Sequence, residues 1–368
     1  MAGQPMTSTP PALPYEPYEA LEDRLHVMVD GAARPASVLT LSHWPQSPTP
    51  AALAHDLSAE IVLGYLGWRD RRRAGSRRAI AKAVAAAASA EAVTNDHFDE
   101  DGLMSVFALV APATALAAAD LVCDVASCGD FGVVATDRAA EIAFAIGPLA
   151  EAEAGSGAGT SELYGAILPL VPELLAHPER FSHHWSAEME MLVASRAAIS
   201  AGEVELAEDR RADLCVVSRS RHDGEFRLPG AEGGLPVHAV AVHSSTTASR
   251  IVAFDGDRCD VFLRYEGWVR YVSRHVPLRP DLEPLAGQLT ALEPGPVTWD
   301  ATGVGAIFGH VHPGGEGRTE IAPEKLESIV REYLVSAPPA WDPFRAGGGY
   351  IPVDERAGYR RRRRGVPQ

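Results

Sequence analysis

The stretch "EAVTNDHFDEDGLMSVFALVAP", residues 91–112, predicts a strand, an acidic loop and a helix in succession. Its loop places four acids and a histidine between Asp96 and Asp101. Repulsion among neighbouring carboxylates costs free energy unless a positive charge lies among them, and hard divalent cations bind carboxylate oxygens. The alternative is a solvated acidic turn that caps the helix, because carboxylates favour helix N-termini. The loop by itself leaves both interpretations open.

Composition indicates a globular protein. The chain has 368 residues, which favours two domains, and its contents of 46% hydrophobic and 22% charged residues are ordinary. No apolar run approaches the roughly 18 residues of a membrane span, and the N-terminus lacks the pattern of a secretory signal. We therefore expect a flexible leader over residues 1–20, no membrane partner and a cytoplasmic location. The four cysteines are too few for a disulfide framework.

Charge is distributed unevenly along the chain. The net charge is −16, yet "RAGYRRRRRGVPQ" at the end carries six arginines and no acid. We expect these last residues, 356–368, to be disordered, within a longer tail over residues 336–368 that is rich in proline, glycine and arginine. The acidic body argues against a broad nucleic-acid-binding face, so a nucleic-acid partner is expected only as a short oligonucleotide.

Strands and helices alternate over residues 21–160. Strands are expected at 24–31, 37–43, 91–95 and 119–126, with helices at 51–68, 77–90, 102–112 and 136–153. This alternation predicts a mainly parallel, doubly wound α/β domain whose ligand site lies beyond the carboxyl ends of the strands. The polar residues that follow predicted strands are candidate metal ligands: His43, His97, Asp99, Asp101, Asp124 and Asp130.

The spacing within the acidic loop suits a metal. His97, Asp99 and Asp101 alternate along an extended segment, so their side chains would point to one side, and Gly102 would permit a sharp turn into the helix. We expect Mn²⁺ or Mg²⁺, with imidazole favouring Mn²⁺. Two alternatives stay open: His43 could hydrogen-bond the proline-rich loop that follows it, and Asp130 could support a ligand histidine or occupy a turn.

The remainder of the chain predicts a helical connection over residues 161–205 and a smaller α/β substrate domain over residues 206–335. Strands are expected at 213–219, 237–245, 250–256 and 260–274, and a helix at 323–334. In "RYEGWVRYVSR" strand alternation would place Arg264, Arg270 and Arg274 on one face, either to bind phosphate or as a solvated charge ladder. The glycine-rich "GHVHPGGEGR" offers His310, His312 and Arg318 as a phosphate cradle.

"HFDEDGLMSVFAL" resembles motif I of the DHH phosphoesterase superfamily. The positions that match the motif are His97, Asp99, Asp101, Gly102, Ser105, Ala108 and Leu109. Asp124 lies where that superfamily has its second aspartate motif. The resemblance implies a two-domain metal-dependent phosphoesterase in which His97, Asp99 and Asp101 are catalytic and Ser105 is near the substrate. The DHH triplet itself is missing after Asp124, and His43 is the natural substitute for its histidine.

A broader resemblance covers residues 20–335. The segments "LSHWPQSPTPAAL", "VTNDHFDEDGL" and "RYEGWVRYVSR" are similar to a family of high-GC bacterial proteins of unknown function, which implies no activity. Two functional hypotheses result. The chain is a divalent-metal-dependent phosphohydrolase acting on a small nucleotide or short oligonucleotide in a cleft between its domains, or it is a catalytically silent sensor of a phosphorylated ligand. The oligomeric state is open.

Overall fold

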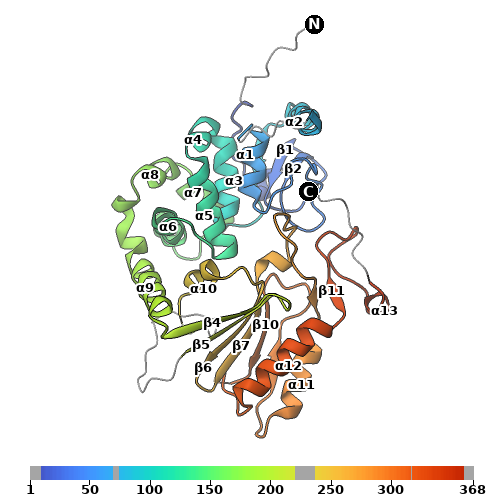
Figure 1. The fold of residues 1–368 in the computed structure, drawn as a ribbon. Coiled ribbons are helices and arrows are strands. Elements are labelled where there is room, and N and C mark those ends of the chain that lie inside the picture. Colours follow the sequence, from blue (N-terminus) through green and yellow to red (C-terminus); the bar gives the residue numbers. More distant parts are fainter. Residues whose placement is uncertain (1–9, 69–73, 220–236, 316, 360–368) are drawn as a thin grey trace. The chain divides into compact units, whose positions relative to one another are not determined.

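The chain is a mixed α/β protein (Figure 1). The computed structural model describes residues 10–68, 74–219, 237–315 and 317–359. The chain divides into two compact units: unit 1 comprises residues 1–130 and 134–186, and unit 2 comprises residues 131–133 and 187–368. In the described part of the chain, no helix is both long and apolar enough to cross a membrane.

The sheet of unit 1 has three parallel strands. They are β1 (His26–Val29), β2 (Ser37–Leu41) and β3 (Ala92–Thr94), in the order β2-β1-β3. All four residues of β1 are buried, as expected of a central parallel strand covered on both faces. Since the strands are parallel, the segments that follow all three leave the sheet at the same edge.

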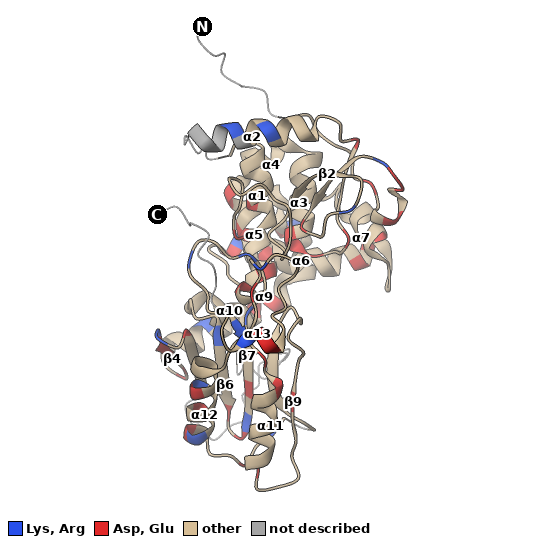
Figure 2. Ribbon diagram, turned by 90° about the vertical axis from the view of Figure 1, so that its right-hand side faces the viewer, with Lys and Arg blue, Asp and Glu red and all other residues tan. Residues whose placement is uncertain are grey.

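Helices make up most of unit 1. They are α1 (Ser58–Tyr65), α2 (Ala74–Ala87), α3 (Glu100–Val110), α4 (Pro112–Ala117), α5 (Ala119–Phe131), α6 (Asp137–Ala154), α7 (Thr160–Ile167) and α8 (Val171–Ala176), with 3₁₀ turns η1 (Tyr18–Ala20) and η2 (Pro178–Phe181). The following helix, α9 (Ser182–Ala201), runs from unit 1 into unit 2. Basic residues mark α2 and acidic residues mark α7 in Figure 2.

The predicted strand at residues 119–126 is wrong, because this segment belongs to helix α5. Its buried residues Ala119, Val122, Val125 and Ala126 repeat at the spacing of one helical face. A short apolar run of this kind fits a buried strand and a buried helix equally well, and packing decides between them. The parallel sheet of unit 1 consequently has three strands in the described residues, fewer than the doubly wound arrangement that the sequence predicts.

The N-terminal segment is ordered where it is described, contrary to the predicted flexible leader. The backbone N–H of Glu16 donates to the Val93 carbonyl at 3.0 Å, and that of Val93 donates to the Pro14 carbonyl at 2.9 Å. The segment thus pairs along the free edge of β3 and satisfies backbone groups that an edge strand would otherwise leave open. Residues 1–9 lie outside the described residues.

Unit 2 is built on a six-stranded mixed sheet. Its strand order is β4 (Val204–Asp209), β5 (Leu214–Arg219), β6 (Arg250–Asp255), β7 (Arg258–Leu263), β10 (Gly309–Pro313) and β9 (Trp299–Ala301), with only β5 and β6 parallel. Alternation along β5 sends Leu214 and Val216 into one apolar cluster and Cys215 and Val217 into another. Helices α11 (Glu283–Leu292) and α12 (Pro323–Ser336) contribute to the first cluster, and α9 and α10 (Ala239–Ser245) to the second.

Two predicted strands of unit 2 are wrong. Residues 237–245 are mostly helix α10, in which three consecutive residues from Val240 to Val242 are buried and the His238 ring caps the first turn. The predicted strand 260–274 ends at Leu263, and the 3₁₀ turn η4 (Tyr265–Gly267) follows. The turn is tight at Gly267, where a Cβ would lie 2.9 Å from Arg279 Nε. Arg264, Arg270 and Arg274 therefore do not share a strand face.

The segment predicted to be a tail, residues 336–368, contains regular structure between residues 339 and 359. Strand β11 (Pro339–Trp341) pairs antiparallel with β8 (Arg279–Pro280), and helix α13 (Val353–Arg356) follows. Arg356 forms an ion pair with Asp281 at 2.8 Å, and the Ile351 side chain is fully buried. Ile351 supplies the apolar anchor that a segment of this composition otherwise lacks. Residues 360–368, which hold five of the arginines, lie outside the described residues.

Candidate metal centre

Histidine and aspartate side chains converge at the carboxyl edge of the parallel sheet in unit 1. Asp30 follows β1, His43 follows β2, and the acidic loop follows β3. Two triads of possible ligands result, Asp30–His97–Asp99 and Asp30–His43–Asp101, and the ligand atoms within each triad lie within 4.8 Å of one another. Asp30 belongs to both triads because β1 is the central strand. This cluster could hold a metal.

The two oxygens of Asp30 face different triads. Oδ1 lies 3.4 Å from His43 Nε2 and accepts a hydrogen bond from the Ser58 hydroxyl at 2.7 Å. Oδ2 lies 3.3 Å from His97 Nε2. A carboxylate placed in this way is suited to bridge two cations.

The inner triad is buried and its histidine is held in one orientation. The Nδ1–H group of His43 donates to the Asp56 carbonyl, which leaves Nε2 facing the cluster. That nitrogen lies 3.4 Å from an oxygen of Asp130 and 3.9 Å from one of Asp101. A lone pair directed at several carboxylates is repelled unless a proton or a metal cation lies between them. Histidines that bind metals commonly donate their other N–H to a carbonyl or carboxylate in this manner.

Asp101 is held by the first turn of α1. Its two oxygens accept backbone N–H groups of Ser58 at 2.7 Å and Ala59 at 2.8 Å. These donors stabilise the carboxylate and leave further lone pairs for a cation. Asp130 reaches the same place from the C-terminal part of α5, and one of its buried oxygens has no hydrogen-bond partner among the described residues.

The outer triad is partly open to solvent. His97 is 30% exposed and Asp99 is 34% exposed at their side chains, whereas His43 and Asp101 are 0% exposed. His97 Nδ1 is 2.9 Å from Asp96 Oδ1, and its Nε2 is 2.9 Å from Asp99 Oδ2. The Trp44 ring packs against His97 with centroids 5.1 Å apart. The outer triad is therefore accessible from solvent at His97 and Asp99.

Burial and mutual repulsion shift the protonation of the cluster. Burial, followed by the charge of Asp30, raises the pKa of Asp101 to about 7, and burial with the charges of Asp101 and Asp99 raises the pKa of Asp130. Burial alone would lower the pKa of His43, but the carboxylates of Asp30 and Asp101 outweigh it and raise that pKa. Without cations, protons must compensate the excess negative charge, so divalent cations would compete with protons for this site.

Asn95 forms hydrogen bonds that connect the end of β1 to the loop that follows β3. Its side-chain N–H groups donate to the carbonyls of Val29 and Asp30, both at 3.2 Å, and its side-chain oxygen accepts the backbone N–H of His97 at 2.7 Å. The residue is fully buried. Asn95 thereby fixes the position of the acidic loop relative to Asp30.

Most of the sequence-predicted ligands come together in this cluster, and one does not. The residues that the structure brings together are His43, His97, Asp99, Asp101 and Asp130. Asp124 lies in the middle of α5, and its oxygens accept the backbone N–H groups of Ala135 at 2.7 Å and Thr136 at 2.9 Å. The prediction that Asp124 ends a strand is wrong, and its carboxylate instead supports the turn before α6.

Replacement of Asp124 by alanine should lower stability without affecting metal binding. Loss of a carboxylate that accepts N–H groups at a helix start typically costs about 0.5–2 kcal/mol. We expect a lower melting temperature and an unchanged response to Mn²⁺, measured by calorimetry with and without the ion. If the Mn²⁺ response were lost, Asp124 would be a ligand, as its match to the second aspartate motif implies.

Asp30, which both triads share, was not among the predicted ligands. The signal was present, because Asp30 lies at the end of the predicted strand 24–31, and a position at the end of a strand or after it selected His43 and Asp99. Ser58 and Asn95 carried no comparable signal. Ser105, the candidate substrate ligand on α3, is fully buried, and its hydroxyl has no hydrogen-bond partner among the described residues. Its role toward a substrate stays a prediction.

In unit 2, the Arg264 side chain donates hydrogen bonds to backbone carbonyls. Its Nη1 donates to the carbonyls of Thr246 at 3.1 Å and Ala248 at 3.3 Å, and its Nη2 donates to that of Phe131 at 3.0 Å. Nη2 also pairs with Glu266 at 2.9 Å, and both side chains are buried. These contacts indicate a structural role for Arg264. Its predicted role in phosphate binding stays a prediction.

The other substrate-binding candidates lie on or near β10. His310 Nε2 is 2.6 Å from Asp260 Oδ1, and the rings of His310 and His312 are 4.6 Å apart. Both histidines belong to β10, so the predicted glycine-rich cradle begins only after this strand. Arg318 is half exposed and contacts both oxygens of Asp257 at 2.6 Å. A phosphate role for these residues stays a prediction.

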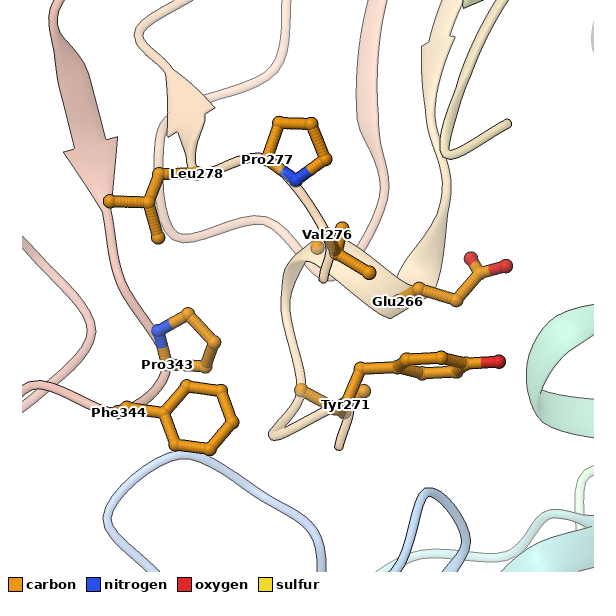
Figure 3. A pocket seen from close by; sticks show the side chains of 9 residues that line it. Glu266, Tyr271, Val276, Pro277, Leu278, Pro343 and Phe344 are labelled. Atoms are coloured by element: carbon orange, nitrogen blue, oxygen red, sulfur yellow. The ribbon is translucent and has the colours of Figure 1, made fainter. Parts of the chain in front are cut away.

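Unit 2 also contains a small pocket (Figure 3). Pro343, Phe344 and Leu278 lie on one side of it, and Glu266 and Tyr271 on the other. Glu266 is the only charged residue in its lining, and one oxygen of this carboxylate pairs with Arg264. The lining therefore does not provide a set of metal ligands.

Comparison with known proteins gives a family but no activity. No curated protein and no solved structure matches the chain. Residues 11–345 match a family described as a family of unknown function, DUF6687. Because this match spans most of the chain, the protein belongs to the DUF6687 family.

Proposed function

We propose that this protein is a divalent-metal-dependent phosphohydrolase acting on a small nucleotide or short oligonucleotide. The observation that carries the proposal is the Asp30 carboxylate, whose two oxygens each face a separate histidine–aspartate triad. Two-metal phosphoesterases use such a pair of sites, with the ions about 3.5–4 Å apart.

The charge of the cluster fits two divalent cations. Four carboxylates, those of Asp30, Asp99, Asp101 and Asp130, face the histidine nitrogens that point into the cluster. A fifth carboxylate, that of Asp96, lies 2.9 Å from the opposite nitrogen of His97. The four negative charges that face the cluster equal the positive charge of two such ions. One imidazole nitrogen in each triad favours Mn²⁺ over Mg²⁺, which prefers oxygen ligands.

Some residues of the centre would hold the ligands in place, and others would be accessible to a substrate. When bound, the cations would supply an activated water and positive charge against the phosphoryl oxygens. The first turn of α1 and the Asp56 carbonyl hold Asp101 and His43 rigidly. The partly exposed His97 and Asp99 face the side from which a substrate would arrive. Trp44 beside His97 offers an aromatic surface suited to a base.

The resemblance of His97, Asp99 and Asp101 to motif I of the DHH phosphoesterases supports the same proposal. In this chain, His43 supplies the second imidazole and Asp30 the shared carboxylate. The proposed centre thus contains the residue types that the motif implies, although a DHH triplet does not supply them.

Metal counting and a hydrolysis assay test the proposal together. We expect about two Mn²⁺ ions per chain by elemental analysis after gel filtration. Hydrolysis of bis(p-nitrophenyl) phosphate and of a dinucleotide should require Mn²⁺ and stop with chelator. One ion per chain, with binding of a phosphorylated ligand but no turnover, would identify a sensor instead. Absence of any bound metal would overturn both the metal centre and the activity.

A further inference from the structure

A buried tyrosine hydroxyl lies close to the outer triad. Tyr164 in α7 is 0% exposed, and its ring packs on Tyr15 and Phe98 with centroids 4.9 and 5.2 Å away. The hydroxyl has no hydrogen-bond partner among the described residues. Leaving a buried hydroxyl without a partner costs about 1–3 kcal/mol. A phenylalanine would avoid this cost with the same ring packing, so the hydroxyl needs a physical reason.

The Tyr164 hydroxyl lies beside Gly102, together with two other polar atoms. A Cβ added to Gly102 would lie 2.7 Å from Asn95 Nδ2, 2.8 Å from the Tyr164 oxygen and 3.0 Å from Asp99 Oδ1. Three polar atoms thus surround the position that a Cβ would occupy at Gly102. Asn95 Nδ2 is a donor that already serves two carbonyls. The acceptor in this group is therefore Asp99 Oδ1.

The two oxygens of Asp99 have different partners. Oδ1 accepts the backbone N–H of Gly102 at 2.7 Å, and Oδ2 lies 2.9 Å from His97 Nε2, toward the cluster. A cation held by His97 and Asp99 would bind Oδ2. The charge that remains on Oδ1 needs donors of its own, since carboxylates that bind metals are commonly hydrogen-bonded through their other oxygen.

We propose that Tyr164 is a positioning residue of the metal centre, whose phenol donates to Asp99 Oδ1 in the metal-loaded protein and keeps Oδ2 directed at the cation. This inference rests on the proposed function, because it requires the outer triad to bind a metal. A phenol ionises near pH 10, so the group is a donor at neutral pH. Gly102 has a matching role, since a larger residue would separate Tyr164 from Asp99.

Tyr164→Phe tests the inference, with Tyr15→Phe as the matched control. Tyr15 stacks on the Tyr164 ring and also has a buried hydroxyl, but it is not among the atoms around Gly102. Mn²⁺ titration of the full chain by calorimetry should show roughly 10- to 100-fold weaker binding at one site in Tyr164→Phe. The melting temperature without metal should be unchanged or higher, because the substitution removes an unpaired buried hydroxyl. Tyr15→Phe should bind Mn²⁺ like the wild type.

The outcomes separate this inference from the proposed function. Wild-type Mn²⁺ affinity in Tyr164→Phe would overturn the positioning role while leaving the metal centre in place. A drop in metal-free stability with unchanged affinity would also overturn it, since that result describes a structural tyrosine. If the wild type bound no Mn²⁺, the proposed function and the role of Tyr164 would fail together.

Discussion

Replacement of Asp30 by asparagine is expected to abolish both metal sites and all hydrolysis at once. Each of its oxygens faces a different histidine, so an amide, which keeps only one oxygen and adds a donor, cannot serve both triads. Wild-type protein at a hundredfold excess of Mn²⁺ over the dissociation constant should gain about 2.7 kcal/mol of stability. For a unit of this size, that corresponds to a rise of roughly 5–10 °C in melting temperature. Asp30→Asn should lose this rise and hydrolyse no faster than the chelated wild type.

Asp99→Asn provides the comparison within the same cluster. Only the outer triad contains Asp99, so this variant should keep one Mn²⁺ ion while Asp30→Asn keeps none. Its hydrolysis should disappear as well, because the substrate-accessible site is lost. Calorimetry with metal and with chelator, together with metal counting, distinguishes the two variants. Equal Mn²⁺ responses in Asp30→Asn and the wild type would show that the ion does not bind at this cluster.

Replacement of Arg264 by alanine should cause the largest loss of stability in unit 2. The substitution leaves the carboxylate of Glu266, which is 3% exposed, without its closest partner, and it removes one donor from each of the carbonyls of Thr246, Ala248 and Phe131. Breaking a buried ion pair by removing one partner costs about 3–5 kcal/mol. Chemical denaturation should show this loss in the free energy of unfolding.

Arg318→Ala is the matched control for that experiment. Its ion pair with Asp257 is half exposed, and such surface pairs contribute about 0–1 kcal/mol. Arg264→Ala also tests the phosphate-binding role that the sequence pattern gave to Arg264. If Arg264→Ala stayed within about 1 kcal/mol of the wild type and instead raised the KM of hydrolysis, the arginine would bind substrate and the structural interpretation would be wrong.

The elements that sequence predicted correctly are those whose signals are local. The strand "AVT", the acidic loop and helix α3 follow one another as expected, since the change from apolar to acidic to apolar residues is visible within the segment. Helix α6 likewise starts within one residue of the predicted start at residue 136, where the Thr136 hydroxyl caps it by accepting the Ala139 N–H at 3.2 Å. Local rules of this kind depend on neighbouring residues and need no knowledge of the rest of the chain.

Short apolar runs were where sequence prediction failed. Residues 119–126 and 237–245 were expected to be strands and are largely helical, because a run of this length satisfies either period and packing decides the outcome. The N-terminal and C-terminal segments were expected to be a flexible leader and a tail for a related reason. Their order depends on partners far along the chain, Val93 for Glu16 and Asp281 for Arg356, which composition does not reveal.

The sequence by itself determined that His43, His97, Asp99 and Asp101 would lie at one edge of a parallel sheet, because residues that follow parallel strands must do so. Only the tertiary structure decided that Asp30 is shared by two triads, since this depends on β1 lying between β2 and β3. The order of strands in a sheet is set by long-range packing, which no local pattern encodes. The same holds for Asp130, which reaches the cluster from a helix, and for Tyr164, which follows the acidic loop by more than 60 residues.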